Sequence, residues 1–198
     1  AVYDSVAYAP IVVRNTGWGM AIDATRPEHV FGACHYNPIL KGDEDPATKI
    51  ALPTVTVDAA ETDLAHERLA AVWDGILPLR RRGVAWSWFA MMDLFIQWRG
   101  LDNTFLDMVD RPAWIHAWMN RMTDWHLAEW EQYEKLGLLS LNNGDCGAVG
   151  VGPGGLGITD CLPARGFDAA RVRRADLWGH ATTQIFAEVS PAMHDEFA

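Results

Sequence analysis

A long amphipathic segment between Asp110 and Gly137 constrains the fold of this chain more than any other feature. This spacing predicts one helix from about Arg111 to Leu136, with a single buried stripe. Asp110 suits the N-cap, Pro112 is tolerated in the first turn, and Gly137 suits the left-handed position past the end. The apolar residues of the stripe are Ile115, Trp118, Met122, Trp125, Trp130, Tyr133 and Leu136.

Short apolar segments on both sides of this helix predict buried strands. Residues 59–74 have helical spacing, and another apolar helix is expected to end at Gly100. Alternating strands and helices predict an α/β fold with one parallel sheet and helices packed on it. The length of the chain leaves open whether that sheet is open or part of a barrel. The predicted parallel strands are residues 84–88, 138–142 and 175–179.

The composition is that of a globular protein, and it excludes two classes of function. The chain has 198 residues, of which 49% are hydrophobic, and its formal net charge is −10. No run of about 18 uncharged apolar residues occurs, which excludes a membrane-spanning helix. The acidic balance argues against a nucleic-acid partner, because phosphates require a basic surface. The length predicts one domain over residues 1–198.

The two ends and the cysteines suggest the context of the chain. Residues 1–4 lack an initiator Met and a signal sequence, and residues 190–198 predict a helix that is cut short, so we expect a piece of a longer chain. Cys34, Cys146 and Cys161 are odd in number and show no C-x-x-C spacing. They predict no disulfide framework and favour a reducing, cytoplasmic setting.

Two motifs suggest a phosphate-binding loop and a zinc site, but their residues support neither. The loop at residues 144–157 is rich in glycine but lacks a Lys-Ser/Thr end, so it is interpreted as a loop over a site or on the surface. His29, Cys34 and His35 match no short zinc pattern, and neighbouring side chains of a strand point to opposite faces. We interpret them as ordinary structural residues.

Polar residues at the end of a predicted strand are better candidates for binding. Asn142, Asn143 and Asp145 follow the carboxyl end of residues 138–142, where parallel α/β folds place their ligand groups. A turn also uses Asn and Asp, so a structural role stays equally open. The ten tryptophans form either a packed core or an aromatic-lined pocket.

Three stretches of the chain carry motifs that occur together in one family. Residues 99–116 contain a glycine, a short helix and a proline at the entry to a long helix. Residues 134–143 lead from that helix into a strand. Residues 176–197 contain Gln184 and, after it, a Ser-Pro-x-Met sequence. Together they resemble the uroporphyrinogen decarboxylase superfamily. That superfamily also contains cobalamin-dependent methyltransferases, which demethylate small methylated or methoxylated compounds.

The resemblance implies a fold, an activity and several cofactors. It implies the central part of a (β/α)8 TIM-type barrel, with parallel strands and outer helices. The implied activity is zinc- and corrinoid-dependent methyl transfer, with zinc as a Lewis acid held by ligands beyond Ala198. The corrinoid would be carried by a separate partner protein, and the enzyme could be a homodimer. The residues expected to bind the small-molecule substrate are Asn142, Asn143, Asp145, Trp178 and Gln184.

Two alternatives stay open beside methyl transfer. Asp4 lies where the decarboxylases carry the Asp that holds the pyrrole N–H groups, so it is the catalytic candidate for uroporphyrinogen decarboxylation. Ile96 stands where they carry an active-site Tyr, which weighs against that activity. The other alternative is a non-catalytic barrel homologue that binds a ligand or a partner protein.

Overall fold

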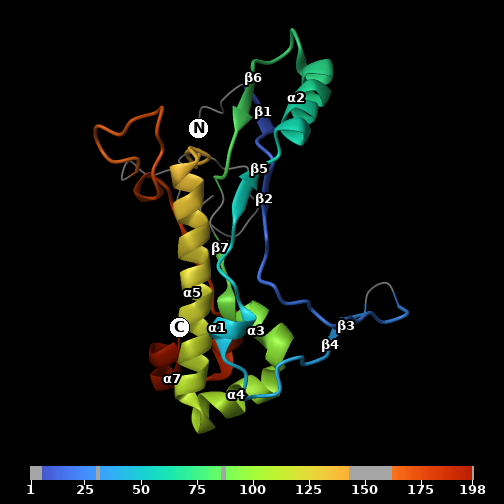
Figure 1. The fold of residues 1–198 in the computed structure, drawn as a ribbon, viewed down its shortest axis with the longest axis vertical. Coiled ribbons are helices and arrows are strands. Elements are labelled where there is room, and N and C mark those ends of the chain that lie inside the picture. The colour runs from blue at the N-terminus through green and yellow to red at the C-terminus, as the bar shows by residue number, and fades with distance from the viewer. Residues whose placement is uncertain (1–5, 30–31, 86–87, 143–161, 198) are drawn as a thin grey trace. The chain divides into compact units, whose positions relative to one another are not determined.

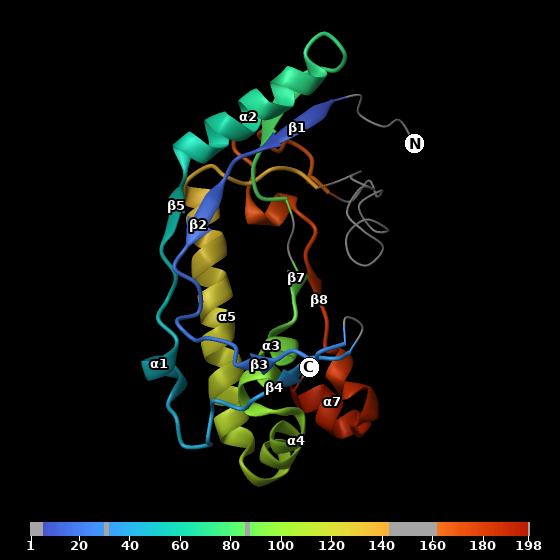
Figure 2. The same cartoon turned by 90° about the vertical axis from the view of Figure 1, so that its right-hand side faces the viewer.

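The computed structural model describes residues 6–29, 32–85, 88–142 and 162–197. The chain divides into two compact units, whose elements Figures 1 and 2 show in two views. Unit 1 contains residues 1–16, 54–87 and 129–180, and unit 2 contains residues 17–53, 88–128 and 181–198. Helix α5 (Pro112–Lys135) supplies its first part to unit 2 and its last part to unit 1.

Unit 1 is built from a parallel and an antiparallel pair of strands. β1 pairs in parallel with β6, and β2 pairs with β5 in antiparallel fashion. Helix α2 begins after Asp58, whose carboxylate accepts a hydrogen bond from the Glu61 amide at 3.0 Å. It lies alongside β1 and β6 (Figure 2) and covers Ala9, which is fully buried. The elements are β1 (Ala7–Pro10), β2 (Val13–Asn15), β5 (Val55–Val57), α2 (Ala59–Trp73), β6 (Leu79–Arg82) and the 3-10 turn η1 (Arg174–Asp176).

The chain beyond β6 meets the segment that follows α5. Val84 and Leu139 form a parallel bridge, with Val84 N donating to Leu138 O at 2.7 Å and Ser140 N donating to Val84 O at 2.9 Å. Gly83 allows this approach, because a Cβ at that position would lie 1.9 Å from the Leu138 carbonyl oxygen. The bridge extends the parallel direction of β1 and β6.

Unit 2 consists mainly of helices. Gly100 separates α3 from α4, and its φ of 86° is a conformation that favours glycine. β7 pairs with β8, next to a bond from Thr182 N to Phe89 O at 2.9 Å. The elements are β3 (Ala24–Thr25), β4 (His35–Tyr36), α1 (Pro46–Lys49), β7 (Trp88–Phe89), α3 (Met91–Arg99), α4 (Leu101–Asp110), β8 (His180–Ala181), η2 (Gln184–Glu188) and α7 (Pro191–Phe197).

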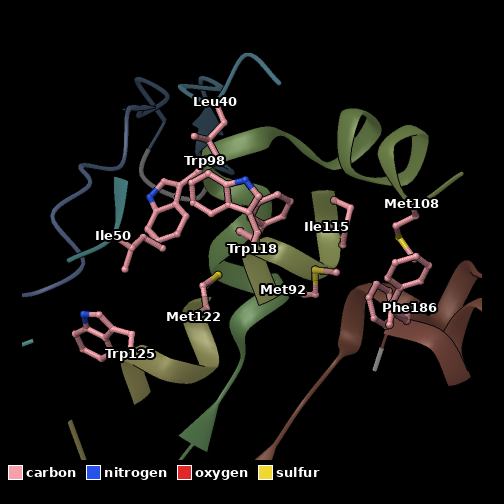
Figure 3. Packing of buried hydrophobic residues seen from close by; sticks show 12 residues of the cluster. Leu40, Ile50, Met92, Trp98, Met108, Ile115, Trp118, Met122, Trp125 and Phe186 are labelled. Carbon is pink, nitrogen blue, oxygen red and sulfur yellow. The ribbon is translucent and has the colours of Figure 1, made fainter. Parts of the chain in front are cut away.

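The buried stripe of α5 forms the centre of the hydrophobic core of unit 2. Ile115, Trp118 and Met122 are fully buried, and they pack with Trp98 of α3 (Figure 3). Trp125 lies at one end of this cluster in Figure 3, and its ring stacks on Trp18 with 3.9 Å between the centroids. Most of the tryptophans of this unit therefore serve as core residues.

The structure confirms the predicted long helix and corrects its first turn. α5 begins at Pro112 and ends at Lys135, and Gly137 adopts a φ of 65° just past the end. Asp110 is the last residue of α4 and not an N-cap, because the Arg111 amide closes α4 on Asp107 O at 2.8 Å. The helices predicted at residues 59–74 and ahead of Gly100 are also confirmed.

The predicted TIM-type barrel segment is wrong. Every sheet in the described residues has two strands, and none of these sheets is closed. The segment at 175–179 is not a strand, because the buried Asp176 carboxylate accepts hydrogen bonds from Arg173 and closes η1. The segment at 138–142 contributes a single bridge to Val84.

In the described part of the chain, no helix is both long enough and apolar enough to cross a bilayer.

Candidate functional site

The candidate site lies in unit 1, where parallel segments end. β1 and β6 run in the same direction, and the bridge between Val84 and Leu139 is also parallel. The carboxyl ends of parallel strands meet at one edge, and α/β proteins bind ligands beyond that edge. Arg82 ends β6 and Asn142 follows the bridged segment, so both belong to this carboxyl edge.

Asn142 is held by the backbone of Trp178. Its Nδ2 donates to Trp178 O at 2.9 Å, and its Oδ1 accepts from Trp178 N at 3.0 Å. The residue is only 3% exposed. The Asn142 side chain thus pairs with the Trp178 backbone as a neighbouring strand would, and it links two segments that are distant in the sequence. One N–H and one lone pair of the amide remain for another contact.

Trp178 brings an indole N–H to the same place. Its Nε1 is buried and has no hydrogen-bond partner among the described residues. Leaving such a donor without a partner costs about 1–3 kcal/mol. A water molecule or the oxygen of a bound ligand would satisfy it.

The turn ahead of Trp178 is fixed by a charged pair. The Asp176 carboxylate accepts hydrogen bonds from Arg173 N, Nε and Nη2 at 2.9, 3.1 and 2.9 Å. These bonds hold the pKa of the Asp176 carboxyl below its usual range. The carboxylate is therefore charged at neutral pH, and it positions Trp178 through the chain.

Arg82 and Tyr8 add a cation and an aromatic ring to unit 1. The Arg82 guanidinium carbon lies 5.1 Å from the centroid of the Tyr8 ring, which is cation–π geometry. Its Nη2 also donates to Leu141 O at 3.3 Å. Arg82 is thus held close to Asn142 through the Leu141 carbonyl.

The structure brings together two of the residues that the sequence predicted for the site. Asn142 and Trp178 are joined directly. Gln184 is exposed at the first position of η2, in unit 2. The other three predictions, Asp4, Asn143 and Asp145, lie outside the described residues.

Sequence reasoning missed Arg82 and Tyr8. A usable signal was the run Arg80-Arg81-Arg82, which is unusual in a chain with a net charge of −10. The predicted strand began at residue 84, whereas β6 spans Leu79–Arg82. The arginines were therefore not recognised as strand residues with two distinct faces.

The residues that the structure describes do not fit a zinc centre. They contain no group of three or more His, Cys, Asp or Glu side chains that could hold a metal ion. Cys34 is exposed as a free thiol, and His35 lies next to it in β4. No zinc ligand is assigned to these residues.

A cavity in unit 1 lies away from this chemistry. It has a volume of about 460 Å³, and His66, Asp74 and Leu79 are among the residues that line it. Leu79 begins β6, so the cavity is at the opposite end of this strand from Arg82. Because parallel sheets bind ligands at their carboxyl edge, we prefer the edge at Arg82 as the site.

The chain was compared with protein-family models, curated proteins and solved structures, and none of them matches.

Proposed function

We propose that this chain carries substrate-binding residues of a uroporphyrinogen decarboxylase-like enzyme that takes part in zinc- and corrinoid-dependent methyl transfer. The substrate would be a small methylated or methoxylated compound. The observation that supports the proposal is the pair of hydrogen bonds between the Asn142 side chain and the Trp178 backbone. It joins residues 134–143 to residues 176–197, two of the three stretches that carry the resemblance.

Each residue at the carboxyl edge has a distinct role in this proposal. Asn142 is a positioning residue, because both ends of its amide are engaged by Trp178. Trp178 contacts the substrate, since its unpartnered indole N–H can donate to a methoxy or carbonyl oxygen. Asn143 and Asp145 are proposed as further substrate contacts.

The cofactors and the setting complete the proposal. Zinc would activate the methyl donor as a Lewis acid. The described residues provide no zinc ligand set, so the roles assigned to them are binding and positioning only. The corrinoid would be carried by a separate partner protein, and the enzyme could act as a homodimer. The exposed thiol of Cys34 favours a reducing, cytoplasmic compartment.

Methyl transfer to a corrinoid tests the proposal directly. The complete protein is mixed with cob(I)alamin and a panel of methoxylated and N-methylated small compounds, and methylcobalamin is followed by its absorption. We expect at least one compound to be demethylated. Trp178→Phe keeps an aromatic face but removes the N–H, so kcat/KM should fall by about tenfold or more.

A matched variant and two further measurements make the test decisive. Trp88→Phe removes the indole N–H of a residue that is 49% exposed and should leave kcat/KM unchanged. Full transfer with zinc content near zero would refute the proposed chemistry. If the protein instead decarboxylates uroporphyrinogen, and Asp4→Asn abolishes this reaction, the activity is decarboxylation and not methyl transfer. Absence of both activities in the zinc-loaded protein would favour a non-catalytic binding protein.

A further inference from the structure

The turn that connects α2 to β6 folds back over the end of the helix. Ile76 N and Leu77 N donate to Trp73 O at 2.9 and 3.0 Å, so the chain reverses at the last residue of α2 (Figure 2). Gly75 allows this reversal, because its φ of 73° is a conformation that favours glycine. β6 then begins at Leu79.

The cavity of about 460 Å³ lies beside this turn. All of its lining residues fall between His66 and Leu79, so one continuous stretch of unit 1 builds it. Binding sites for small molecules have volumes of about 300–1,000 Å³, and this cavity is within that range.

Two polar side chains line the cavity from the end of α2. His66, Ala70 and Asp74 are spaced by four residues, which places them on one side of the helix. His66 is partly buried and Asp74 is exposed. Neither side chain makes a hydrogen bond or an ion pair within the part of the chain that the structure describes. The carboxylate and the imidazole are therefore both available to a ligand.

The charge at this end of α2 is negative. A helix C-terminus carries about half an elementary negative charge, and the Asp74 carboxylate adds a full one. The last turn of α2, which the structure describes in full, contains no basic residue. A positively charged group at this end would therefore be stabilised by the helix and by the carboxylate together.

The arginines nearest in the sequence do not neutralise this charge. Arg68 falls on the opposite side of α2 from the residues that line the cavity. Arg80 lies on the opposite face of β6 from the lining residue Leu79. Arg81 Nη2 is paired with Asp63 Oδ1 at 2.6 Å. The cavity thus keeps its negative end in the folded chain.

The other wall of the cavity is apolar. It is formed by the turn and by the start of β6, and Ile76 in this wall is 66% exposed. A cavity with one negative end and apolar walls matches a ligand that has a cationic group on an apolar body. A metal ion fits less well, because His66 and Asp74 supply only two ligand side chains and zinc takes at least three.

We propose that this cavity binds a small organic amine. Its ammonium group pairs with the Asp74 carboxylate, and its apolar part packs against Ile76 and Leu77. An ammonium has three N–H donors, and a ring nitrogen of neutral His66 can accept one of them. The cavity is at the opposite end of β6 from Arg82, so this second site does not depend on the proposed methyl transfer.

A nuclear magnetic resonance titration of the complete protein tests the amine site without turnover. Cyclohexylmethylamine is the probe, and cyclohexylmethanol is its neutral counterpart of the same shape. We expect the amine to shift the amide signals of residues 70–79, with a Kd of about 1 mM or tighter. Cyclohexylmethanol should bind at least about tenfold more weakly, because it cannot form the ion pair.

Asp74→Asn removes the charge and keeps the shape of the side chain. It should weaken binding of the amine by about tenfold or more, because a hydrogen bond to a charged group is lost. Asp110→Asn is the matched control, since Asp110 is an exposed carboxylate at the end of α4 in unit 2. It lowers the net charge by the same amount and should leave the affinity unchanged.

A second pair of variants tests the apolar wall. Ile76→Ala should weaken binding of the amine by about threefold or more, because less apolar surface is buried. Val72→Ala is its control, since Val72 is 60% exposed and does not line the cavity. Both side chains are largely exposed, so neither substitution should disturb the fold.

Three results would overturn the proposal. They are a set of shifted amides outside residues 70–79, equal binding of cyclohexylmethanol and the amine, and equal weakening by Asp74→Asn and Asp110→Asn. Zinc and corrinoid are absent from these titrations. Failure of methyl transfer with intact amine binding therefore refutes only the proposed function, and loss of amine binding refutes only the amine site.

Discussion

Several buried polar side chains in this protein are held by specific partners. Asp107 is nearly buried, and its carboxylate accepts from Arg99 Nε at 2.8 Å and from Arg111 Nη2 at 2.5 Å. In unit 1, Asn142 is hydrogen-bonded to the Trp178 backbone, and Asp176 is hydrogen-bonded to Arg173. A buried polar group without partners is costly, so removing one member of such a pair destabilises the folded chain.

Replacing Asn142 by Ala removes both hydrogen bonds to Trp178 and leaves the Trp178 backbone N–H and C=O without these partners. We expect the free energy of unfolding to fall by about 1–3 kcal/mol. Urea denaturation followed by tryptophan fluorescence measures this change. Asn120→Ala, at an exposed position of α5, is the control and should change stability by less than about 0.5 kcal/mol. Equal effects would show that the Asn142 bonds contribute little.

The lowered pKa of Asp176 predicts how stability depends on pH. A carboxyl group whose pKa is lower in the folded state stabilises the protein above its unfolded pKa of about 3.9. This contribution is lost as the pH falls through the folded pKa. Asp176→Asn should therefore lower the melting temperature at neutral pH, and the difference from the wild type should shrink below about pH 4. A difference that is independent of pH would contradict this reading of the Arg173 contacts.

Helix α5 organises unit 2 because its apolar residues follow the helical period. Residues at spacings of three and four fall on one side of a helix, and in α5 these are the buried residues of the core. Leu127, in the same helix, is 55% exposed. The buried and exposed positions of α5 should therefore respond very differently to the same substitution.

Ile115→Ala removes a fully buried side chain and leaves a cavity between α5 and its neighbours in unit 2. The free energy of unfolding should fall by about 2–5 kcal/mol. Leu127→Ala is the matched control and should cost less than about 1 kcal/mol. Thermal denaturation by circular dichroism measures both, and a larger effect at Leu127 would contradict the assigned core.

Gly83 lies where two segments of unit 1 come close together. Gly83→Ala places a Cβ against the Leu138 carbonyl, so the parallel bridge must open or shift. Hydrogen exchange of the Val84 and Ser140 amides should accelerate, because both donate across this bridge. Gly75→Ala strains a turn whose φ is 73°, but no atom lies within 4 Å of the added Cβ, so these two amides should stay unchanged. Unchanged exchange in Gly83→Ala would show that the bridge adapts.

The whole chain is acidic, and that charge controls its behaviour in solution. It carries 26 Asp and Glu against 16 Lys and Arg, and its isoelectric point is about 5.0. At neutral pH the molecules repel each other, and this repulsion vanishes as the net charge approaches zero.

Solubility should therefore pass through a minimum near pH 5.0 and recover at higher pH. Static light scattering across a pH series measures the onset of association. Salt should shift this onset toward higher pH, because it screens the repulsion between exposed charges. Association that is strongest at neutral pH would contradict a control by net charge.

The long helices could be predicted from local signals in the sequence. The spacing of apolar residues, a proline at the start and a glycine past the end are local signals, and they located α5 to within one residue at each end. The strands are harder to predict from the sequence, because a short apolar run becomes a strand only if a partner segment pairs with it. At residues 175–179 the Arg173–Asp176 contacts closed a turn instead, and the predicted parallel sheet did not form.

The candidate site could not be predicted in the same way, because its residues meet only in the folded chain. The rule that ligand groups follow parallel strands pointed to Asn142, but its hydrogen-bond partner Trp178 lies 36 residues further along the chain. Arg82 and Tyr8 are also brought together only by the pairing of β1 with β6. Contacts between distant residues depend on which segments pair, and no local pattern of residues carries that information.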